Sequence, residues 1–144
     1  MNLLSTTAKI FFKYRLNEIE HLKKNPIKAQ EEVFKKLINT AKDTEWGKKY
    51  NYASIYNISE FQNNVPISSY EEIFPFISRI MEGEKNILWP GTISWFAKSS
   101  GTTNARSKFI PVSLESLEEC HLKAGKDTVM LYQKNNPNTK ILDG

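Results

Sequence analysis

The residues best suited to bind a ligand lie between positions 95 and 111, where an apolar run, a hydroxyl-rich segment and a second apolar run follow one another. The hydroxyl-rich segment contains one glycine and reads Ser99, Ser100, Gly101, Thr102 and Thr103. Two strands joined by such a turn would bring backbone N–H groups and four hydroxyls into one small volume that holds no carboxylate. Such a volume suits an anion, and phosphate is the commonest anion that a protein must hold. These residues therefore predict a nucleotide-phosphate loop.

Three cations, Lys98, Arg106 and Lys108, lie in or beside this segment. The segment is also longer than the roughly two to five residues of an ordinary hairpin loop. The alternative is a solvent-facing turn, because serine and threonine side chains often bond their own backbone. The Walker A pattern is absent, and no helix is expected directly after the loop. A phosphate would therefore bind on a strand–loop–strand unit rather than at a helix N-terminus.

The composition is that of a globular protein with one core. The chain has 144 residues and a net charge of +4, and its lysines are scattered along amphipathic segments, which favours a solvated surface over a nucleic-acid site. A single cysteine, Cys120, excludes an internal disulfide, and His21 and His121 have no neighbours at metal-ligand spacing. No apolar run approaches the ~20 residues of a membrane span, and the N-terminus does not resemble a signal peptide. We expect a cytoplasmic protein with no nucleic-acid, membrane or protein-ligated metal partner.

Apolar residues at steps of three and four predict helices over residues 3–24, 26–42 and 114–133. The first, an N-terminal helix within residues 1–25, is also basic and amphipathic, so membrane-surface binding is an alternative to packing on a core. Asn25 is expected to cap the second helix, with Pro26 at its first position, and Ser113 is expected to cap the third. The faces expected to be buried comprise Ile27, Phe34, Leu37, Ile38 and Ala41 in the second helix, and Leu114, Leu117, His121, Ala124, Thr128 and Leu131 in the third.

Between these helices, the sequence predicts a connection over residues 44–50 and a short helix capped by Ser59. Ser69 and Glu72 form a capping box, Ser-x-x-Glu, that opens a further helix, and Pro75 is expected to kink or divide it. Strands are expected over residues 93–98 and 108–112, on either side of the loop. The predicted fold class is α+β, mostly helical, with a β-hairpin that carries the loop.

The ordered motifs of this chain resemble the N-terminal part of the auxin-responsive acyl-acid amido synthetases, the Gretchen Hagen family of the adenylate-forming superfamily. The resemblance is carried first by the segment 96–103, with Lys108 and Ile110-Pro111, which matches the family's first ATP motif. Supporting motifs occur in the family's order, and the match covers residues 30–144. These motifs are Thr44 to Tyr50, Val65-Pro66-Ile67, Tyr70-Glu71, Pro75 to Arg79, Gly83-Glu84 and Leu88-Trp89.

The resemblance implies a ligase that activates a carboxylic acid with ATP and then joins the acyl group to an amino acid. On this basis Ser99, Ser100, Gly101, Thr102, Thr103 and Lys108 are the expected nucleotide-binding residues, and no catalytic residue is assigned. Mg²⁺ is implied as a bridge between phosphate oxygens, without an identified protein ligand. The resemblance also implies that residues 1–144 are one part of a larger α/β adenylate-forming domain.

The family's second and third nucleotide motifs do not occur in the sequence, so the remainder of the synthetase is an expected partner. We expect the 144 residues alone to be inactive. The alternative hypothesis is a non-catalytic interaction or scaffold module derived from the same fold.

Overall fold

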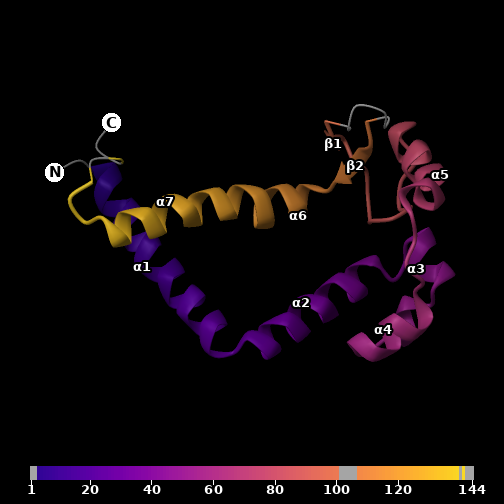
Figure 1. The fold of residues 1–144 in the computed structure, drawn as a ribbon, viewed down its shortest axis with the longest axis horizontal. Helices are drawn as coiled ribbons and strands as arrows, with labels where there is room; N and C mark the ends of the chain where they lie inside the picture. Colours follow the sequence, from indigo (N-terminus) through magenta and orange to yellow (C-terminus); the bar gives the residue numbers. More distant parts are fainter. Residues whose placement is uncertain (1–2, 101–106, 140, 142–144) are drawn as a thin grey trace. The chain divides into compact units, whose positions relative to one another are not determined.

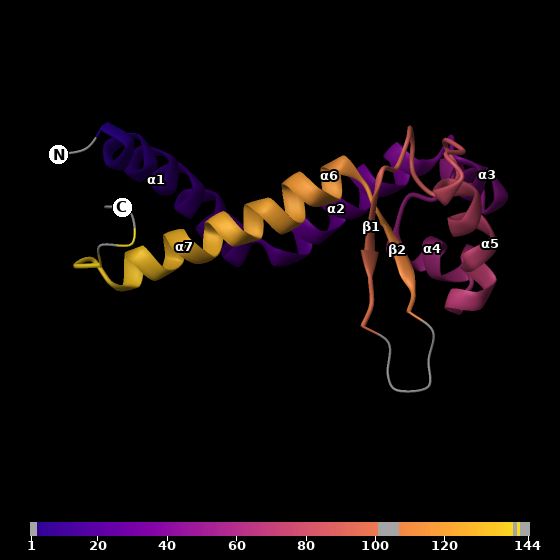
Figure 2. The same cartoon turned by 90° about the horizontal axis from the view of Figure 1, so that it is seen from above.

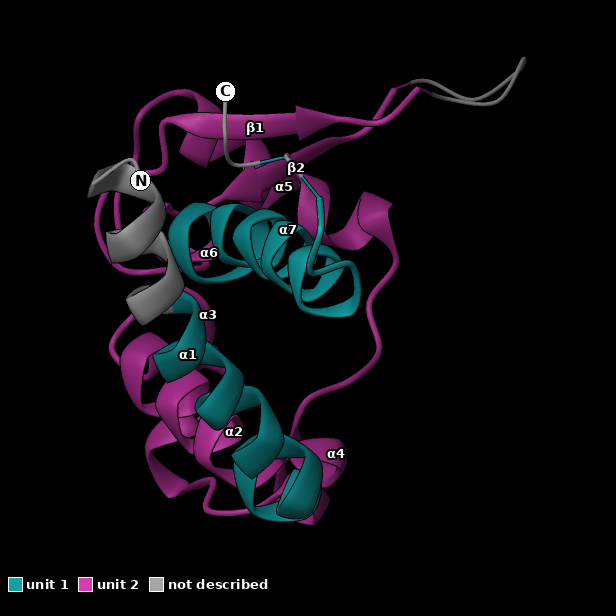
Figure 3. Cartoon of the chain, turned by 90° about the vertical axis from the view of Figure 1, so that its left-hand side faces the viewer, with its two compact units in different colours: residues 1–29, 117–144 teal, residues 30–116 magenta. Residues whose placement is uncertain are grey.

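The computed structural model describes residues 3–100, 107–139 and 141, with the side chains of the first helix described from Phe12 onward. The chain forms two compact units: residues 1–29 with 117–144, and residues 30–116 (Figure 3). We call these unit 1 and unit 2. None of the helices in the described part of the chain combines the length and the hydropathy that a membrane span requires.

Unit 1 contains α1 (Leu3–Lys24), the start of α2 (Pro26–Ala41), a π-helix (Leu117–Leu122) and α7 (Lys123–Asn135). A bidentate ion pair joins α1 to α7, because the Arg15 Nε and Nη2 groups donate to the two Asp127 carboxylate oxygens at 2.9 and 2.8 Å. Arg15 also donates to Glu18 at 2.6 Å, and the Arg15 guanidinium lowers the pKa of Asp127. Met130, only 1% exposed, is the buried centre of α7.

The long helix after Ser113 begins at the predicted residue and ends two residues beyond the predicted end. The Ser116 N–H donates to the Ser113 hydroxyl at 3.1 Å, so the predicted cap is confirmed. The chain then runs through α6 (Leu114–Ser116), the π-helix and α7, and the helix ends at Asn135 before Pro137.

The predicted buried face of this helix is wrong. Leu114 is 59% exposed, Leu131 is 38% exposed, and His121, Ala124 and Thr128 are exposed as well. After the π-helix, the buried or half-buried residues include Lys123, Asp127 and Met130, each one position before the predicted Ala124, Thr128 and Leu131. This is the side of α7 from which Asp127 bonds Arg15 of α1. Met130, which lies outside the predicted face, is buried instead.

Unit 2 is built from short elements that follow α2, and Figures 1 and 2 show them from two directions. In order they are α3 (Glu45–Lys49), a 3₁₀ turn (Tyr52–Ser54), α4 (Ile58–Asn64), α5 (Tyr70–Met81), β1 (Trp95–Lys98), β2 (Phe109–Val112) and α6. Its core has two clusters, one around Ile38 and Tyr52 and one around Ile80 and Ile93. Trp89 packs against both clusters and so joins them.

The hairpin is antiparallel, with Trp95 opposite Val112 and Lys98 opposite Phe109. The predicted strands are therefore confirmed, with ends shifted by one or two residues. The predicted fold class, mostly helical with a β-hairpin that carries the loop, is confirmed too.

The connection predicted over residues 44–50 is instead a helix, α3. Thr44, only 1% exposed, is its N-cap. The Thr44 hydroxyl accepts the Gly47 N–H at 3.0 Å and donates to the Ala41 carbonyl at 2.6 Å, which ties the end of α2 to the start of α3. Gly47 lies so close to this corner that an added Cβ would overlap the Ala41 carbonyl oxygen and come within 2.9 Å of Lys42 backbone atoms. We call Thr44 and Gly47, with the Ala41 carbonyl, the α2–α3 corner.

The caps of the other helices match the prediction in part. Both hydrogen bonds of the Ser69–Glu72 capping box are present, and this prediction is confirmed. Asn57, not Ser59, caps α4. The side-chain amide of Asn25, the predicted cap of α2, donates to the His21 carbonyl of α1 at 3.1 Å. Pro75 lies inside α5 without dividing it, because proline removes a single backbone donor and α5 is packed along its buried face.

The buried face predicted for α2 is too wide. Ile38 and Ala41 are buried and Phe34 packs beside them, but Ile27 is 68% and Leu37 is 48% exposed. Within unit 2, Leu37 instead lines an open apolar groove of about 540 Å³ with residues of α2, α4 and the Leu88-Trp89 segment.

Replacing Gly47 by alanine should destabilise unit 2 by about 2 kcal/mol or more, because the new methyl group meets backbone rather than a movable side chain. Urea unfolding followed by circular dichroism measures this change. Gly125→Ala is the control: nothing lies within 4 Å of a Cβ there, and alanine in a helix should stabilise by up to about 1 kcal/mol. Equal stabilities for Gly47→Ala and the parent protein would contradict the steric role of this position.

Candidate phosphate-binding hairpin

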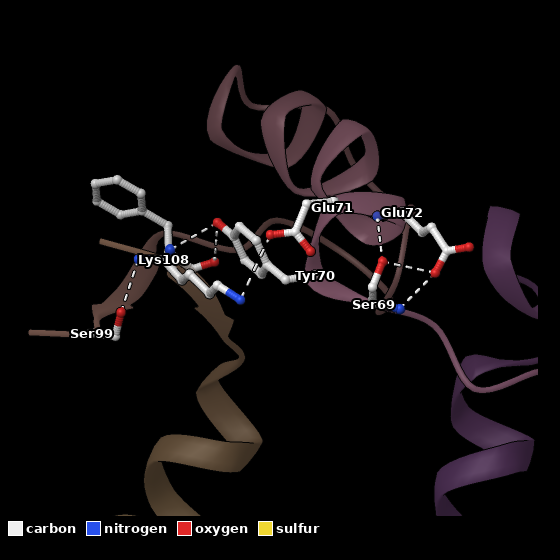
Figure 4. A network of polar contacts seen from close by, with 7 residues as sticks. Ser69, Tyr70, Glu71, Glu72, Ser99 and Lys108 are labelled. Carbon is white, nitrogen blue, oxygen red and sulfur yellow. Dashed lines mark hydrogen bonds and ion pairs between the residues drawn. The ribbon is translucent and has the colours of Figure 1, made fainter. Parts of the chain in front are cut away.

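The two strands are held together where the predicted loop begins and ends. The Ser99 N–H donates to the Lys108 carbonyl at 2.9 Å, and the Lys108 N–H donates to the Ser99 hydroxyl at 2.9 Å. The two bonds, of which Figure 4 draws the one to the Ser99 hydroxyl, fix both ends of the segment between these residues. The Ser99 hydroxyl therefore has a structural partner, and its role is to close the neck of the loop.

The structure describes three of the six predicted nucleotide-binding residues. Ser99 is half-buried at the neck, and Ser100 is exposed just beyond it. The Lys108 side chain is 46% exposed. Gly101, Thr102 and Thr103, together with Ala105 and Arg106, lie outside the described residues.

Lys108 projects from the neck toward the first turn of α5 (Figure 4). Its ammonium lies 4.9 Å from the centre of the Tyr70 ring and 3.8 Å from a carboxylate oxygen of Glu71. Both the Lys108 and Glu71 side chains are largely exposed, so this contact adds little to stability. The ammonium is therefore held near the neck but remains accessible to an anion from solvent.

The Tyr70 hydroxyl attaches β2 to α5. It accepts the Phe109 N–H at 2.9 Å and donates to the Phe109 carbonyl at 3.4 Å. The N–H and the carbonyl of Phe109, the residue after Lys108, are thus both bonded to the Tyr70 side chain. The first turn of α5 is itself fixed, because the Glu72 carboxylate accepts the N–H of Ser69 at 2.7 Å, and this bond lowers the pKa of Glu72.

An arginine holds the other end of α5. The Arg79 guanidinium makes a bidentate bond to Glu45 of α3, at 2.7 and 2.8 Å, and a second one to Glu84. The guanidinium lowers the pKa of both carboxyls, and the carboxylates raise the pKa of Arg79. The three side chains form a clamp between α3, α5 and the turn after α5.

Two further contacts join α3 to its surroundings in unit 2. The Glu45 and Trp46 N–H groups donate to the carbonyls of Asn86 and Ile87 at 2.8 and 3.0 Å. The Trp46 ring meets the Phe76 ring of α5 edge to face at 5.1 Å. The turn that leads into β1 is therefore bonded to α3, and α3 is packed on α5.

The chemistry available at the hairpin is that of an anion site. Its described part offers the Lys108 ammonium, with the Lys98 ammonium on the neighbouring strand 5.8 Å from the Phe109 ring, and the exposed Ser100. No group of three or more His, Cys, Asp or Glu side chains that could hold a metal occurs among the described residues.

The sequence did not assign roles to Tyr70, Glu71 and Arg79, although all three belong to motifs that carry the family resemblance. A signal for Tyr70 was present, since it directly follows the capping serine of α5 and so must lie in the first turn. Its partner, Phe109, is 39 residues away, and no sequence pattern reveals that pairing.

Comparison with protein families gives one match that spans most of the chain. The model described as "GH3 family N-terminal domain" matches residues 15–143.

Known proteins of similar sequence agree with this match. The indole-3-acetic acid-amido synthetase GH3.2 of Arabidopsis thaliana is 32% identical over 108 residues, which are 74% of this chain and 20% of that protein. The jasmonoyl–L-amino acid synthetase JAR6 of Nicotiana attenuata is 33% identical over 104 residues, 72% of this chain and 18% of that protein.

A solved structure, "AtGH3.15 acyl acid amido synthetase in complex with 2,4-DB", is similar with a TM-score of 0.73 and 29% identity. The similarity covers 85% of this chain and 21% of that chain. This chain therefore spans about a fifth of the length of the relatives that it matches.

Ser99→Ala should loosen the neck, because the Lys108 N–H loses its acceptor. A lost hydrogen bond of this kind costs about 0.5–1.5 kcal/mol, so the Lys108 amide should exchange with solvent several-fold faster. Hydrogen exchange followed by NMR measures this rate. The control is Ser94→Ala, at an exposed position just before β1. An unchanged Lys108 exchange rate in Ser99→Ala would show that the hydroxyl does not hold the neck.

The Arg79 clamp predicts a dependence of stability on pH. Arg79 holds the folded-state pKa of Glu45 and Glu84 below the ordinary 4.5, so the unfolded chain binds more protons near that pH. The contribution of the clamp is complete above about pH 5 and is lost as pH falls through the lowered values. Urea midpoints near pH 7 and pH 3 should therefore differ less in Arg79→Gln than in the parent.

Arg79→Lys is the matched control for this measurement, because it keeps one positive charge but loses the paired bonds to both carboxylates. The difference between its urea midpoints at pH 7 and pH 3 should lie between those of the parent and of Arg79→Gln. If the urea midpoint of Arg79→Gln differed from that of the parent by the same amount at both pH values, the clamp would not be the source of the pH dependence.

Proposed function

Because the chain belongs to the GH3 family, through that family's N-terminal domain, we propose that it supplies the ATP phosphate-binding part of an acyl-acid amido synthetase. In the proposed reaction a carboxylate attacks the α-phosphorus of ATP, forms an acyl-adenylate and releases pyrophosphate. The amine of an amino acid then displaces AMP and forms the amide. The acid and the amino acid are substrates of the complete synthetase.

The observation that carries this proposal is the geometry of the neck. The Ser99–Lys108 bonds fix the two ends of a hydroxyl-rich segment, and a cation lies beside it. A loop whose ends are already fixed loses less conformational entropy when it binds a ligand. The Lys108 ammonium would offset the negative charge that grows on the leaving pyrophosphate.

The proposed roles of the individual residues follow from their chemistry. Ser100, Thr102 and Thr103 would supply hydroxyl and backbone donors to the β- and γ-phosphates. Gly101 would let the backbone approach the phosphate oxygens closely. Ser99 would hold the two ends of the loop together through its bonds to Lys108. Mg²⁺ would enter with the nucleotide, held by phosphate oxygens, and we assign it no protein ligand.

We further propose that residues 1–144 are one incomplete part of the synthetase domain, with residues 1–25 forming its N-terminal helix, and that they have no ligase activity alone. The groups that bind adenine and ribose would come from the remaining four fifths of a GH3 protein. An interaction module that has kept this fold is the second candidate, and the open apolar groove of unit 2 is the observation that favours it.

A binding experiment on the 144-residue chain tests the proposal. Inorganic tripolyphosphate, titrated into ¹⁵N-labelled protein, should shift the amide signals of Ser99, Ser100 and Lys108. Replacing Ser100 and Thr102 together by alanine should weaken binding by about tenfold or more, because two charge-assisted hydrogen bonds are lost.

Replacing Ser54 and Ser94 together by alanine is the control, since both are exposed serines of unit 2 outside the hairpin. This variant should bind as the parent does. A folded parent that does not bind tripolyphosphate or ATP would reject the phosphate-binding role and favour the interaction module.

A further inference from the structure

We propose that the dipeptide Tyr70-Glu71 controls the anion site: Tyr70 positions Lys108, and Glu71 weakens the hold of Lys108 on phosphate. This inference rests on the proposed function, because it concerns the strength of phosphate binding at the same hairpin. It assigns roles to two residues that contact β2 or Lys108 (Figure 4).

Tyr70 acts through the backbone of β2. Its hydroxyl bonds the N–H and the carbonyl of Phe109, and the Lys108 N–H is bonded to Ser99 on the other strand. The backbone on both sides of the Lys108 side chain is therefore fixed, once by α5 and once by β1. The Tyr70 ring also lies under the Lys108 ammonium at 4.9 Å, a cation–π contact that favours one position of the side chain.

Glu71 acts through charge. Its carboxylate lies 3.8 Å from the Lys108 ammonium, a distance at which two unit charges interact by about 1 kcal/mol even at the dielectric constant of water. An incoming polyphosphate must compete with this carboxylate for the ammonium, and the carboxylate also repels the added negative charge. Glu71 therefore lowers affinity for phosphate without blocking access to it.

Such a device suits a reaction that must release a charged product. Uniformly tight binding of phosphates lowers the free energies of bound substrate and transition state together and does not speed the chemical step. Pyrophosphate would also leave slowly from a site in which the ammonium had no competing partner. An acid beside the cation keeps the ammonium in place and limits its affinity for the product.

The first test is Glu71→Gln, which keeps the size of the side chain and removes its charge. Tripolyphosphate should bind this variant about fivefold more tightly at low salt, as measured by calorimetry, and the gain should shrink as salt rises. A variant with a damaged site would bind more weakly, so a gain in affinity identifies the electrostatic role.

Glu82→Gln is the matched control for Glu71→Gln. It removes the same charge from the far end of α5, eleven residues or about 16 Å along the helix. The two variants are compared at 0.1 M salt, where this distance exceeds the screening length of about 10 Å. Its affinity should stay close to that of the parent. In a Lys108→Gln background, Glu71→Gln should give at most a small gain, because the charge that it competes for is absent.

The second test is Tyr70→Phe, which keeps the ring under Lys108 and removes the hydroxyl. The Phe109 amide should exchange faster, and tripolyphosphate should bind roughly three- to tenfold more weakly, since a misplaced ammonium loses a charge-assisted contact. Circular dichroism checks that the variant is folded.

The outcomes separate this inference from the function on which it rests. A folded parent without polyphosphate affinity overturns both. A parent that binds, together with a Glu71→Gln variant of equal or lower affinity, overturns the role of Glu71 alone and leaves the phosphate site in place. A Tyr70→Phe variant with faster Phe109 exchange but unchanged affinity overturns the positioning role of Tyr70.

Discussion

The close approach of α3 to the end of α2 is the constraint on which the rest of unit 2 depends. At the α2–α3 corner, the Thr44 hydroxyl joins the Ala41 carbonyl to the Gly47 N–H, and only a residue without a Cβ fits at position 47. This approach sets the direction of a helix of only five residues, which could not hold its own orientation by helix propensity. With α3 in this orientation, Glu45 can bond to Asn86 through its backbone N–H and to Arg79 through its carboxylate.

These contacts connect the corner to the hairpin by a short series of bonded steps. The Arg79 clamp and the Trp46–Phe76 ring pair fix α5 against α3, and Tyr70 at the start of α5 fixes β2. The bonds of Asn86 and Ile87 to α3 fix the turn that leads into β1. Both strands of the hairpin are therefore held by groups outside it, which matters because a two-stranded hairpin alone is at best marginally stable in water.

Local patterns foretold much of this arrangement, and long-range pairings account for what they missed. The Ser69–Glu72 box and the Ser113 cap each join residues three positions apart, and each strand is a short apolar run, so the sequence shows them directly. The contact of Tyr70 with Phe109 and that of Arg79 with Glu45 join residues more than thirty positions apart. The π-helix is a third case, because nothing in the sequence of Leu117–Leu122 departs from an α-helical pattern.

At the candidate site, the structure adds contacts that residue type alone does not reveal. Ser99 is a predicted phosphate ligand because it is a hydroxyl in a hydroxyl-rich run, and its oxygen also accepts the Lys108 N–H. That bond places Lys108, and Lys108 in turn lies between the Tyr70 ring and the Glu71 carboxylate. The proposed strand–loop–strand site does not lie at the N-terminus of a helix, so the position of its cation would have a strong influence on anion affinity. On this proposal, the side chains that set the position of Lys108 would influence how tightly the hairpin binds a phosphate and how readily it releases it.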